Sequence, residues 1–342
     1  MSPENINQRI LLQRRPTGAP TPDCFRFEDS PVPKPADGEV LLQNRYLSLD
    51  PYMRGRMSDA PSYAEPVAIG DVMGAGTISR VLQSHNPSFA PGDMVVAYGG
   101  WQTYAVSNGK GLTKLPPDIP HPSLALGVLG MTGFTGYAGL LEIGKPIPGE
   151  TVVVAGASGA VGSVVGQVAR LKGARAVGIA GGAEKCRVVL EDFGFDACVD
   201  HHLPDFAARL KDACRDGIDV YFENVGGKVF DAVLPLLNTL ARIPLCGLIA
   251  NYNDTALPPG PDRLGLLMRT LLTKRISVRG FIVSSDFNDG FDAFSAQMAA
   301  WVKDGQVKYR EDIVEGLDAA PQAFICLLQG KNLGKLIVHI GN

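Results

Sequence analysis

Residues 151–173 read TVVVAGASGAVGSVVGQVARLKG, and this stretch decides the fold that we expect. A short β-branched run precedes a glycine turn, and an apolar segment follows that ends at Gly173. Strand, turn and helix in this order predict the first unit of a dinucleotide-binding fold. Gly159 would let the backbone approach a pyrophosphate, and Gly162 would let the helix pack closely on the strand. Ala157 stands where this fingerprint usually begins with glycine, so a tight turn without a ligand is the alternative.

The end of the second strand indicates which nucleotide would bind. NAD sites carry an acidic residue about 20 residues beyond the glycine turn, where it binds the ribose hydroxyls. Here that place holds Ala180-Gly-Gly-Ala183, and the cation of Lys185 follows closely. A missing acid and a nearby lysine favour the 2′-phosphate of NADP(H). The alternative for Lys185 is a solvated helix residue.

Composition narrows the class of protein. The chain has 342 residues, of which 45% are apolar and 20% charged, and its formal net charge is −3. This length allows two domains, and the charge gives no reason to expect nucleic acid or an anionic membrane as partner. The six cysteines are scattered without C-x-x-C spacing, which predicts neither a disulfide framework nor a structural zinc site. We see no secretory signal and no apolar run of roughly 20 residues, so we expect a protein of the reducing cytoplasm.

The character of the sequence changes along the chain. Residues 1–123 are rich in proline and glycine, with short β-like runs, and predict an irregular β domain. Residues 124–285 alternate between apolar β-branched runs and helix-like segments, which predicts a parallel sheet covered on both faces. The strand-like runs are 151–155, 176–180, 196–200, 218–223, 243–250 and 276–283. Residues 286–342 hold two helix-like segments and a final strand at 335–340, which we expect to return to the first domain.

Five motifs, spread over nearly the whole chain, resemble the zinc-independent medium-chain dehydrogenase/reductase family, in its leukotriene B4 dehydrogenase/prostaglandin reductase group. They are LSLDPYMRGRM (47–57), LGMTGFT (129–135), ENVGG (223–227), CGLIANYN (246–253) and GKNLGK (330–335). Within the group, AGGAEKC (180–186), DHH (200–202) and KVFDAVLPLLN (228–238) are similar to the NADPH-dependent curcumin reductases of bacteria. The resemblance implies an α/β protein with a GroES-like catalytic domain, a Rossmann doubly wound NADP-binding domain, NADPH as cofactor and a homodimer.

The resemblance also implies a nucleotide site that draws on several motifs. Its implied members are Gly159, Ala160, Val161, Gly162, Lys185, His201, Asn224, Cys246, Gly247, Leu248, Ile249, Ala250, Asn251, Tyr252, Phe281, Ile282, Val283 and Asn332. Mammalian prostaglandin reductases carry a tyrosine where this chain has His201, whereas the curcumin-reductase-like proteins share the histidine. We expect no metal site, because His201 and His202 would point to opposite faces of a strand.

Without zinc, a hydroxyl group must stabilise the negative charge that a hydride pushes onto the substrate. Tyrosine suits this task, because its pKa of about 10 keeps it protonated at neutral pH. The resemblance places Tyr252 beside the nicotinamide ribose and the substrate carbonyl, and it implicates Tyr63 and Tyr52 in the pocket wall. We therefore expect reduction of the C=C bond of an α,β-unsaturated ketone or aldehyde. Arg54 and Arg56 either clamp an acidic substrate or are structural.

Other functions stay open at this point. A quinone reductase of the same fold would use the same NADPH site. A short-chain dehydrogenase is disfavoured, because its Tyr-x-x-x-Lys motif does not occur in the sequence. A protein that binds NADPH without catalysis is a further alternative, and a small-molecule enone is the partner that we expect.

Overall fold

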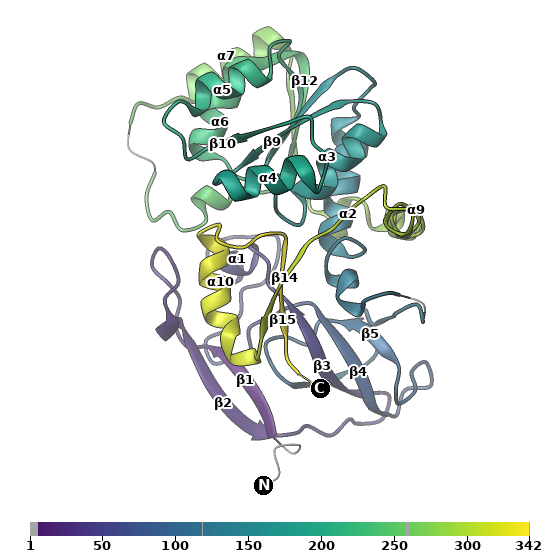
Figure 1. The fold of residues 1–342 in the computed structure, drawn as a ribbon. Helices are drawn as coiled ribbons and strands as arrows, with labels where there is room; N and C mark the ends of the chain where they lie inside the picture. Colours follow the sequence, from purple (N-terminus) through teal and green to yellow (C-terminus); the bar gives the residue numbers. More distant parts are fainter. Residues whose placement is uncertain (1–5, 118, 258–259, 342) are drawn as a thin grey trace.

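The computed structural model describes residues 6–117, 119–257 and 260–341, and its strands form two large sheets and a hairpin (Figure 1). One sheet is wholly parallel, with the strand order β10-β9-β8-β11-β12-β13. Counted from β8, this is the order 3-2-1-4-5-6 of doubly wound dinucleotide-binding folds, so the α/β prediction is confirmed. Its strands are β8 (Thr151–Ala155), β9 (Arg175–Ala180), β10 (Ala197–Asp200), β11 (Ile218–Phe222), β12 (Leu237–Leu245) and β13 (Ser277–Gly280).

The first strand of this sheet is buried on both faces. All five residues of β8 are buried; Val152 and Val154 pack into one apolar core, whereas Val153 and Ala155 pack into another. This alternation follows from the two-residue period of a strand. The first core also holds side chains of α2 (Met131–Ala138), α3 (Gly162–Leu171), α4 (Ala183–Glu191) and α9 (Phe291–Lys303), and the second holds those of α5 (Phe206–Ala213) and α6 (Gly227–Val233).

The other sheet combines strands from the N-terminal and the C-terminal parts of the chain, because β15 (Lys335–His339) pairs antiparallel with β3 (Val40–Ser48). Its order is β14-β15-β3-β4-β5-β7, and β6 also pairs with β3. The other strands of this sheet are β4 (Thr77–Ser84), β5 (Met94–Ala97), β6 (Tyr104–Ser107), β7 (Thr113–Lys114) and β14 (Glu311–Glu315). The hairpin consists of β1 (Ile6–Leu12) and β2 (Phe25–Pro31), and the remaining helices are α1 (Met53–Arg56), α7 (Leu264–Lys274), α8 (Val283–Asp286) and α10 (Ala320–Leu328).

Residues 286–342 were expected to return to the first domain, but they divide between the cores of the two large sheets. Phe294 of α9 lies with its ring centroid 5.1 Å from that of Phe134 in α2, inside the core of the parallel sheet. Of the described residues after 285, those of β14, β15 and α10, together with Leu317, join the sheet that contains β3 or its core. The boundaries at residues 123 and 285 stay a prediction, and we propose that the nucleotide unit continues through α9.

One predicted strand lies earlier in the sequence than expected. The run 243–250 was expected to be extended, but β12 begins at Leu237 and ends at Leu245. Residues beyond it turn back at once: the N–H groups of Cys246 and Gly247 both donate to the carbonyl oxygen of Glu223, at 2.9 and 3.1 Å. These bonds hold the segment over the end of β11 and give residues 246–252 the shape of a loop.

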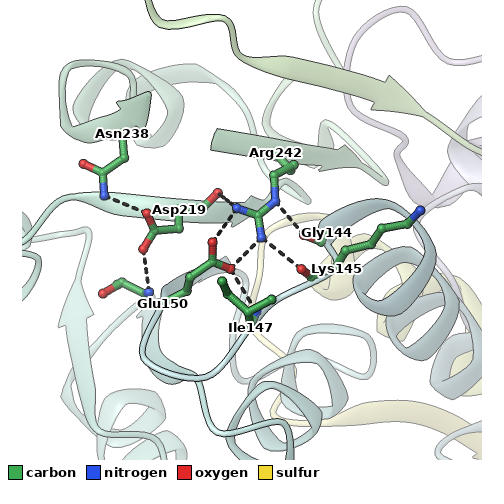
Figure 2. Close-up of polar contacts among 8 residues, drawn as sticks. Gly144, Lys145, Ile147, Glu150, Asp219, Asn238 and Arg242 are labelled. Carbon is green, nitrogen blue, oxygen red and sulfur yellow. Dashed lines mark hydrogen bonds and ion pairs between the residues drawn. The ribbon is translucent and has the colours of Figure 1, made fainter. Parts of the chain in front are cut away.

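Arg242 of β12 holds together the amino ends of the central strands (Figure 2). Its guanidinium forms a bidentate pair with Glu150, at 2.8 and 2.5 Å, and donates to the carbonyl oxygens of Gly144, Lys145 and Asp219. The side chains of Arg242 and Glu150 are 22% and 17% exposed. The cluster lies at the end of the sheet opposite to the glycine turn, and this leaves the carboxyl ends of the strands free for a ligand. No helix in the described residues has the length and apolarity to cross a membrane.

Candidate functional site

A cleft of about 2050 Å³ is lined by residues of both large sheets and their loops. On one side lie the residues that follow the carboxyl ends of β8, β9 and β11, and on the other lie parts of residues 48–76 and 327–336. The order of the parallel sheet reverses between β8 and β11, and ligands of such sheets bind in the crevice at this reversal. The glycine turn therefore lies where the fold predicts a ligand.

The glycine turn depends on two glycines for its shape. Gly156 has a φ of 65°, which side chains rarely tolerate. A Cβ atom at Gly162 would lie 2.3 Å from the carbonyl oxygen of Gly156, so only glycine fits there. Gly159 lies between them and forms a bridge with Gly334 of the C-terminal segment. Residues 159–162, at the start of α3, thus line the cleft, and a helix N-terminus suits a phosphate.

The only acid at the end of β10, Asp200, is engaged by the main chain. Its Oδ1 accepts hydrogen bonds from the N–H groups of Gly182, at 2.8 Å, and His202, at 2.9 Å. Burial would raise the pKa of this carboxyl group, but these two bonds outweigh burial and lower it. Asp200 is therefore a support for the turn after β9, and its Oδ1 is already occupied by two donors.

Lys185 is half-buried at the same end of the cleft. Its Nζ donates to the carbonyl oxygen of Gly330 at 2.5 Å, which links α4 to the C-terminal segment. Burial lowers the pKa of the Lys185 ammonium group, and the carboxylates of Asp312 and Glu184 oppose this shift. The cation lines the cleft, as Gly181 does, and its contact with a 2′-phosphate stays a prediction.

His201 also lines the cleft and is a neutral base. Burial, followed by the neighbouring charges of His202 and Lys228, lowers the pKa of His201 to about 4. Its Nδ1 is buried and has no hydrogen-bond partner within residues 6–117, 119–257 and 260–341. The Cβ that Gly181 lacks would lie 3.0 Å from His201 Nε2, so the ring packs directly on this glycine.

The loop after β12 supports Tyr252. The Tyr252 hydroxyl accepts a hydrogen bond from the N–H of Leu248 at 3.4 Å, so its own proton remains available to another acceptor. Burial raises the pKa of Tyr252, and the backbone hydrogen bond works against this. The hydroxyl is thus protonated at neutral pH, which a hydrogen-bond donor requires.

The rings of Tyr52 and Tyr63 both lie near the guanidinium group of Arg56. Arg56 lies 5.7 Å from the ring centroid of Tyr52 and 4.6 Å from that of Tyr63, at cation–π distance. Burial is the main cause that raises the pKa of both tyrosines. Tyr98 also lines the cleft here and fills the space left by Gly74, where a Cβ would lie 2.5 Å from its hydroxyl. No local pattern in the sequence indicated Tyr98.

Most of the implied site residues line the one cleft, although their contacts with a ligand stay predictions. Those that line it are Tyr52, Tyr63, Gly159, Ala160, Val161, Gly162, Lys185, His201, Asn224, Cys246, Gly247, Ile249, Ala250, Tyr252, Phe281, Ile282, Val283 and Asn332. Leu248 and Asn251 do not line it, and both side chains lie over Gly226 instead. Arg54 is structural: it donates to Asn253 at 3.0 Å and to the carbonyl oxygen of Gly18 at 2.8 Å.

Metal ligands are not grouped in the described part of the chain. Within residues 6–117, 119–257 and 260–341, no three histidine, cysteine or acidic side chains are placed to share an ion. The six cysteines are free thiols.

Comparison with known proteins agrees with this geometry. Residues 8–115 match the family model for the N-terminal domain of oxidoreductases, and residues 160–303 match that for zinc-binding dehydrogenases. The chain is 58% identical over 334 residues to the NADPH-dependent curcumin reductase of Escherichia coli (strain K12), covering 98% of this chain and 97% of that protein. It is 40% identical over 332 residues to prostaglandin reductase 1 of Rattus norvegicus, covering 96% and 97%.

A solved structure shows the same fold. CurA from Vibrio vulnificus in complex with NADPH is 56% identical and superposes with a TM-score of 0.95, covering 98% of this chain and 99% of that one. Fold, cleft and glycine turn together define a two-domain oxidoreductase. The chain belongs to the medium-chain dehydrogenase/reductase family, in the group that contains curcumin reductase and prostaglandin reductase 1.

The neutral state of His201 predicts a loss of stability in acid. Its pKa of about 4 lies below the usual 6.5, so below pH 6.5 the unfolded chain takes up a proton that the folded chain refuses. Stability therefore falls as the pH drops from 6.5 towards 4. At pH 5 we expect this to cost about 1–2 kcal/mol after solvent screening. Urea unfolding at pH 7 and pH 5 should show the loss in the wild type and a smaller loss in His201→Gln; equal losses would contradict the assignment.

Proposed function

We propose that this protein is an NADPH-dependent reductase of the C=C bond of α,β-unsaturated ketones and aldehydes. The observation that carries the proposal is the single cleft, which joins the glycine turn and Lys185 to the hydroxyl groups of Tyr252, Tyr52 and Tyr63. Relatives of this chain are named NADPH-dependent curcumin reductase, prostaglandin reductase 1 and NADP(+)-dependent 2-alkenal reductase, and these names support a reductase activity of this kind here.

The residues of the cleft fit NADPH. Gly162 lets α3 start close to the end of β8, where a Cβ would meet the carbonyl oxygen of Gly156, and the main chain of residues 159–162, which lines the cleft, would bind the pyrophosphate. Lys185 would bind the 2′-phosphate and give up its bond to Gly330. Asp200 is held by two N–H groups and does not take the place of a ribose-binding acid. NADPH supplies the hydride when it is bound.

The tyrosines would stabilise the charge that the hydride creates. Tyr252 already accepts from Leu248, so it can donate its own proton to an enolate oxygen. Such a donor acts in the manner of an oxyanion hole, because the hydrogen bond strengthens as charge develops on the carbonyl oxygen. Tyr63 and Tyr52 are further donors on the opposite wall, where Arg56 fixes their rings.

Oxidation of NADPH by a panel of substrates tests this function. We expect turnover with enones and enals, for example 4-phenyl-3-buten-2-one and 2-hexenal, and saturated products by mass spectrometry. A clear preference for quinones would instead identify a quinone reductase of the same fold. Tight NADPH binding without turnover on any of these compounds would identify a non-catalytic nucleotide-binding protein.

We further propose a homodimer of the cytoplasm. All four residues of the edge strand β13 are exposed, and an unpaired strand edge offers a row of N–H and C=O groups to another strand. The neighbouring helix α7 has no buried residue and exposes Leu264, Leu266, Met268 and Leu272. A second copy related by a two-fold axis would cover both elements. Six free thiols suit a reducing compartment, and cell fractionation would check this location.

The proposed dimer predicts a change of mass on substitution of α7. Leu272 is 78% exposed, so Leu272→Glu should leave the monomer folded and place a charge in the interface. Sedimentation velocity should then show a dimer for the wild type and monomers for the variant. Leu171→Glu, on α3, is the matched control and should remain dimeric. A monomeric wild type would refute the proposal.

Lys185 is expected to set the preference for NADPH. A charge-assisted hydrogen bond to phosphate contributes roughly 1.5–3 kcal/mol, or about ten- to hundredfold in affinity. We expect the lower end for Lys185→Ala, because the wild-type lysine must leave Gly330 first. Fluorescence titration should show weaker NADPH binding and nearly unchanged NADH binding. Lys172→Ala serves as control, and equal losses for both nucleotides would sink the assignment.

Tyr252→Phe removes one hydroxyl and keeps the ring. Loss of one donor to a developing oxyanion costs about 10²–10³ in turnover in a dry site. A ribose hydroxyl would share this task, so we expect about tenfold or somewhat more. Steady-state kinetics should place the loss on kcat, with little change in NADPH affinity. Full kcat in the variant would show that Tyr63, Tyr52 or the ribose holds the enolate instead.

A further inference from the structure

A lysine and an aspartate form a buried ion pair at the wall of the cleft. Lys335 Nζ lies 2.9 Å from Asp50 Oδ1, and the two side chains are 4% and 5% exposed. The same ammonium group donates to the carbonyl oxygen of Leu49 at 2.9 Å, and Ser48 Oγ donates to Asp50 Oδ2. All four residues line the cleft. The charges are therefore paired and hydrogen-bonded where the two sheets meet the ligand space.

Stability alone does not account for such a pair. Burial of two charges carries a large desolvation cost, and apolar residues of similar volume often stabilise a fold as well or better. An ion pair of this kind instead fixes the relative position of the two segments that carry it, because its hydrogen bonds are directional. The position of those segments indicates what the pair does.

On one side, the main chain next to Lys335 is bonded to the glycine turn. Lys335 begins β15 directly after Gly334, whose N–H donates to the carbonyl oxygen of Ser158 at 3.1 Å. Gly334 also forms the bridge with Gly159. A Cβ at Gly334 would lie 2.3 Å from the carbonyl oxygen of Arg310, and its φ is 90°, so this backbone is tightly held.

On the other side, the pair supports the wall that carries the tyrosines. We call residues 48–56 the substrate wall. The main-chain carbonyl oxygen of Asp50 accepts a hydrogen bond from the N–H of Met53 at 3.1 Å and thereby starts the turn that presents Tyr52 and α1. Arg56 of α1 lies over the rings of Tyr52 and Tyr63. The N–H of Leu49 also donates to β15, at the carbonyl oxygen of Leu336.

We propose that Lys335 and Asp50 are positioning residues that fix the place of the substrate wall relative to the glycine turn. A nucleotide bound at Ser158 and Gly159 then also orders Tyr52. The pair then sets the geometry in which an enone meets the nicotinamide, without touching either. This role rests on the proposed function.

The test replaces the pair by apolar residues of similar size. Lys335→Met with Asp50→Leu leaves no unpaired charge, so the double variant is expected to fold. Hydrogen–deuterium exchange should show that NADPH slows exchange in residues 48–56 and in 156–162 of the wild type. In the double variant, NADPH should protect 156–162 only. For 4-phenyl-3-buten-2-one, kcat/KM should fall at least tenfold, with NADPH affinity within about threefold of the wild type.

A second variant and a matched control keep the test decisive. Asp50→Asn retains an acceptor for Lys335 and covers the case in which the double variant does not fold; we expect the same loss of protection in 48–56. Arg242→Met breaks an ion pair of similar chemistry at the far end of the parallel sheet. It should reduce stability, yet keep the wild-type exchange pattern and kcat/KM.

The outcomes separate this proposal from the proposed function. If NADPH still protects residues 48–56 in both variants, or if kcat/KM is unchanged, the pair does not position the wall. If the wild type reduces no enone, the proposed function fails. The exchange experiment still decides whether the pair links the two segments, because it needs only NADPH binding.

Discussion

The close approach of α3 to the end of β8 is the constraint on which this structure depends. With 2.3 Å between the carbonyl oxygen of Gly156 and the place where a Cβ of residue 162 would lie, the helix can start only at a glycine. The helix then begins inside the crevice where the sheet order reverses, with its free N–H groups at the cleft. The ends of β9 and β11 and the bridge from Gly159 to Gly334 surround this point, so the nucleotide side of the cleft is built mostly from main chain.

The two ends of the parallel sheet have opposite characters. At the amino end, Arg242 and Glu150 satisfy one another and four further main-chain or side-chain groups, which makes that end a closed structural cluster (Figure 2). At the carboxyl end, His201 and Tyr252 keep hydrogen-bonding capacity that no group in the described part of the chain uses. Buried polar groups without a hydrogen-bond partner lower the stability of a fold, but beside a cleft they can bind a ligand. This contrast between the two ends of the sheet therefore indicates the functional site without reference to a sequence motif.

The sequence predicted what local patterns determine. The β8 run matched residue for residue, because an apolar β-branched strand and a glycine turn are both local signals. The start of β12 was not predicted because Asn238 and Thr239 interrupt its apolar pattern and Leu240 takes a φ of 65°, so its strand character comes from pairing with β11 and β13. The resemblance implied Leu248 and Asn251 as cofactor residues, and their contact with a cofactor stays a prediction. Neither lines the cleft, because in a loop the direction of each side chain depends on what it packs against. The place of Tyr98 in the cleft and the pairing of Asp50 with Lys335 depend on tertiary contacts, so no local pattern could predict them.

The pairing of β15 with β3 has a consequence for synthesis of the chain. Leu47 pairs with Val338, whereas Val40–Gln43 of the same strand pair with β6, so the Tyr46–Ser48 part of β3 lacks a neighbour until β15 has left the ribosome. The βαβ units of the parallel sheet have their partners close by in sequence, and contacts between near neighbours form faster than distant ones. The sheet that contains β3 is therefore completed only after β15 has been translated, and until then the edge of β3 at Tyr46–Ser48 stays open to aggregation or to a chaperone.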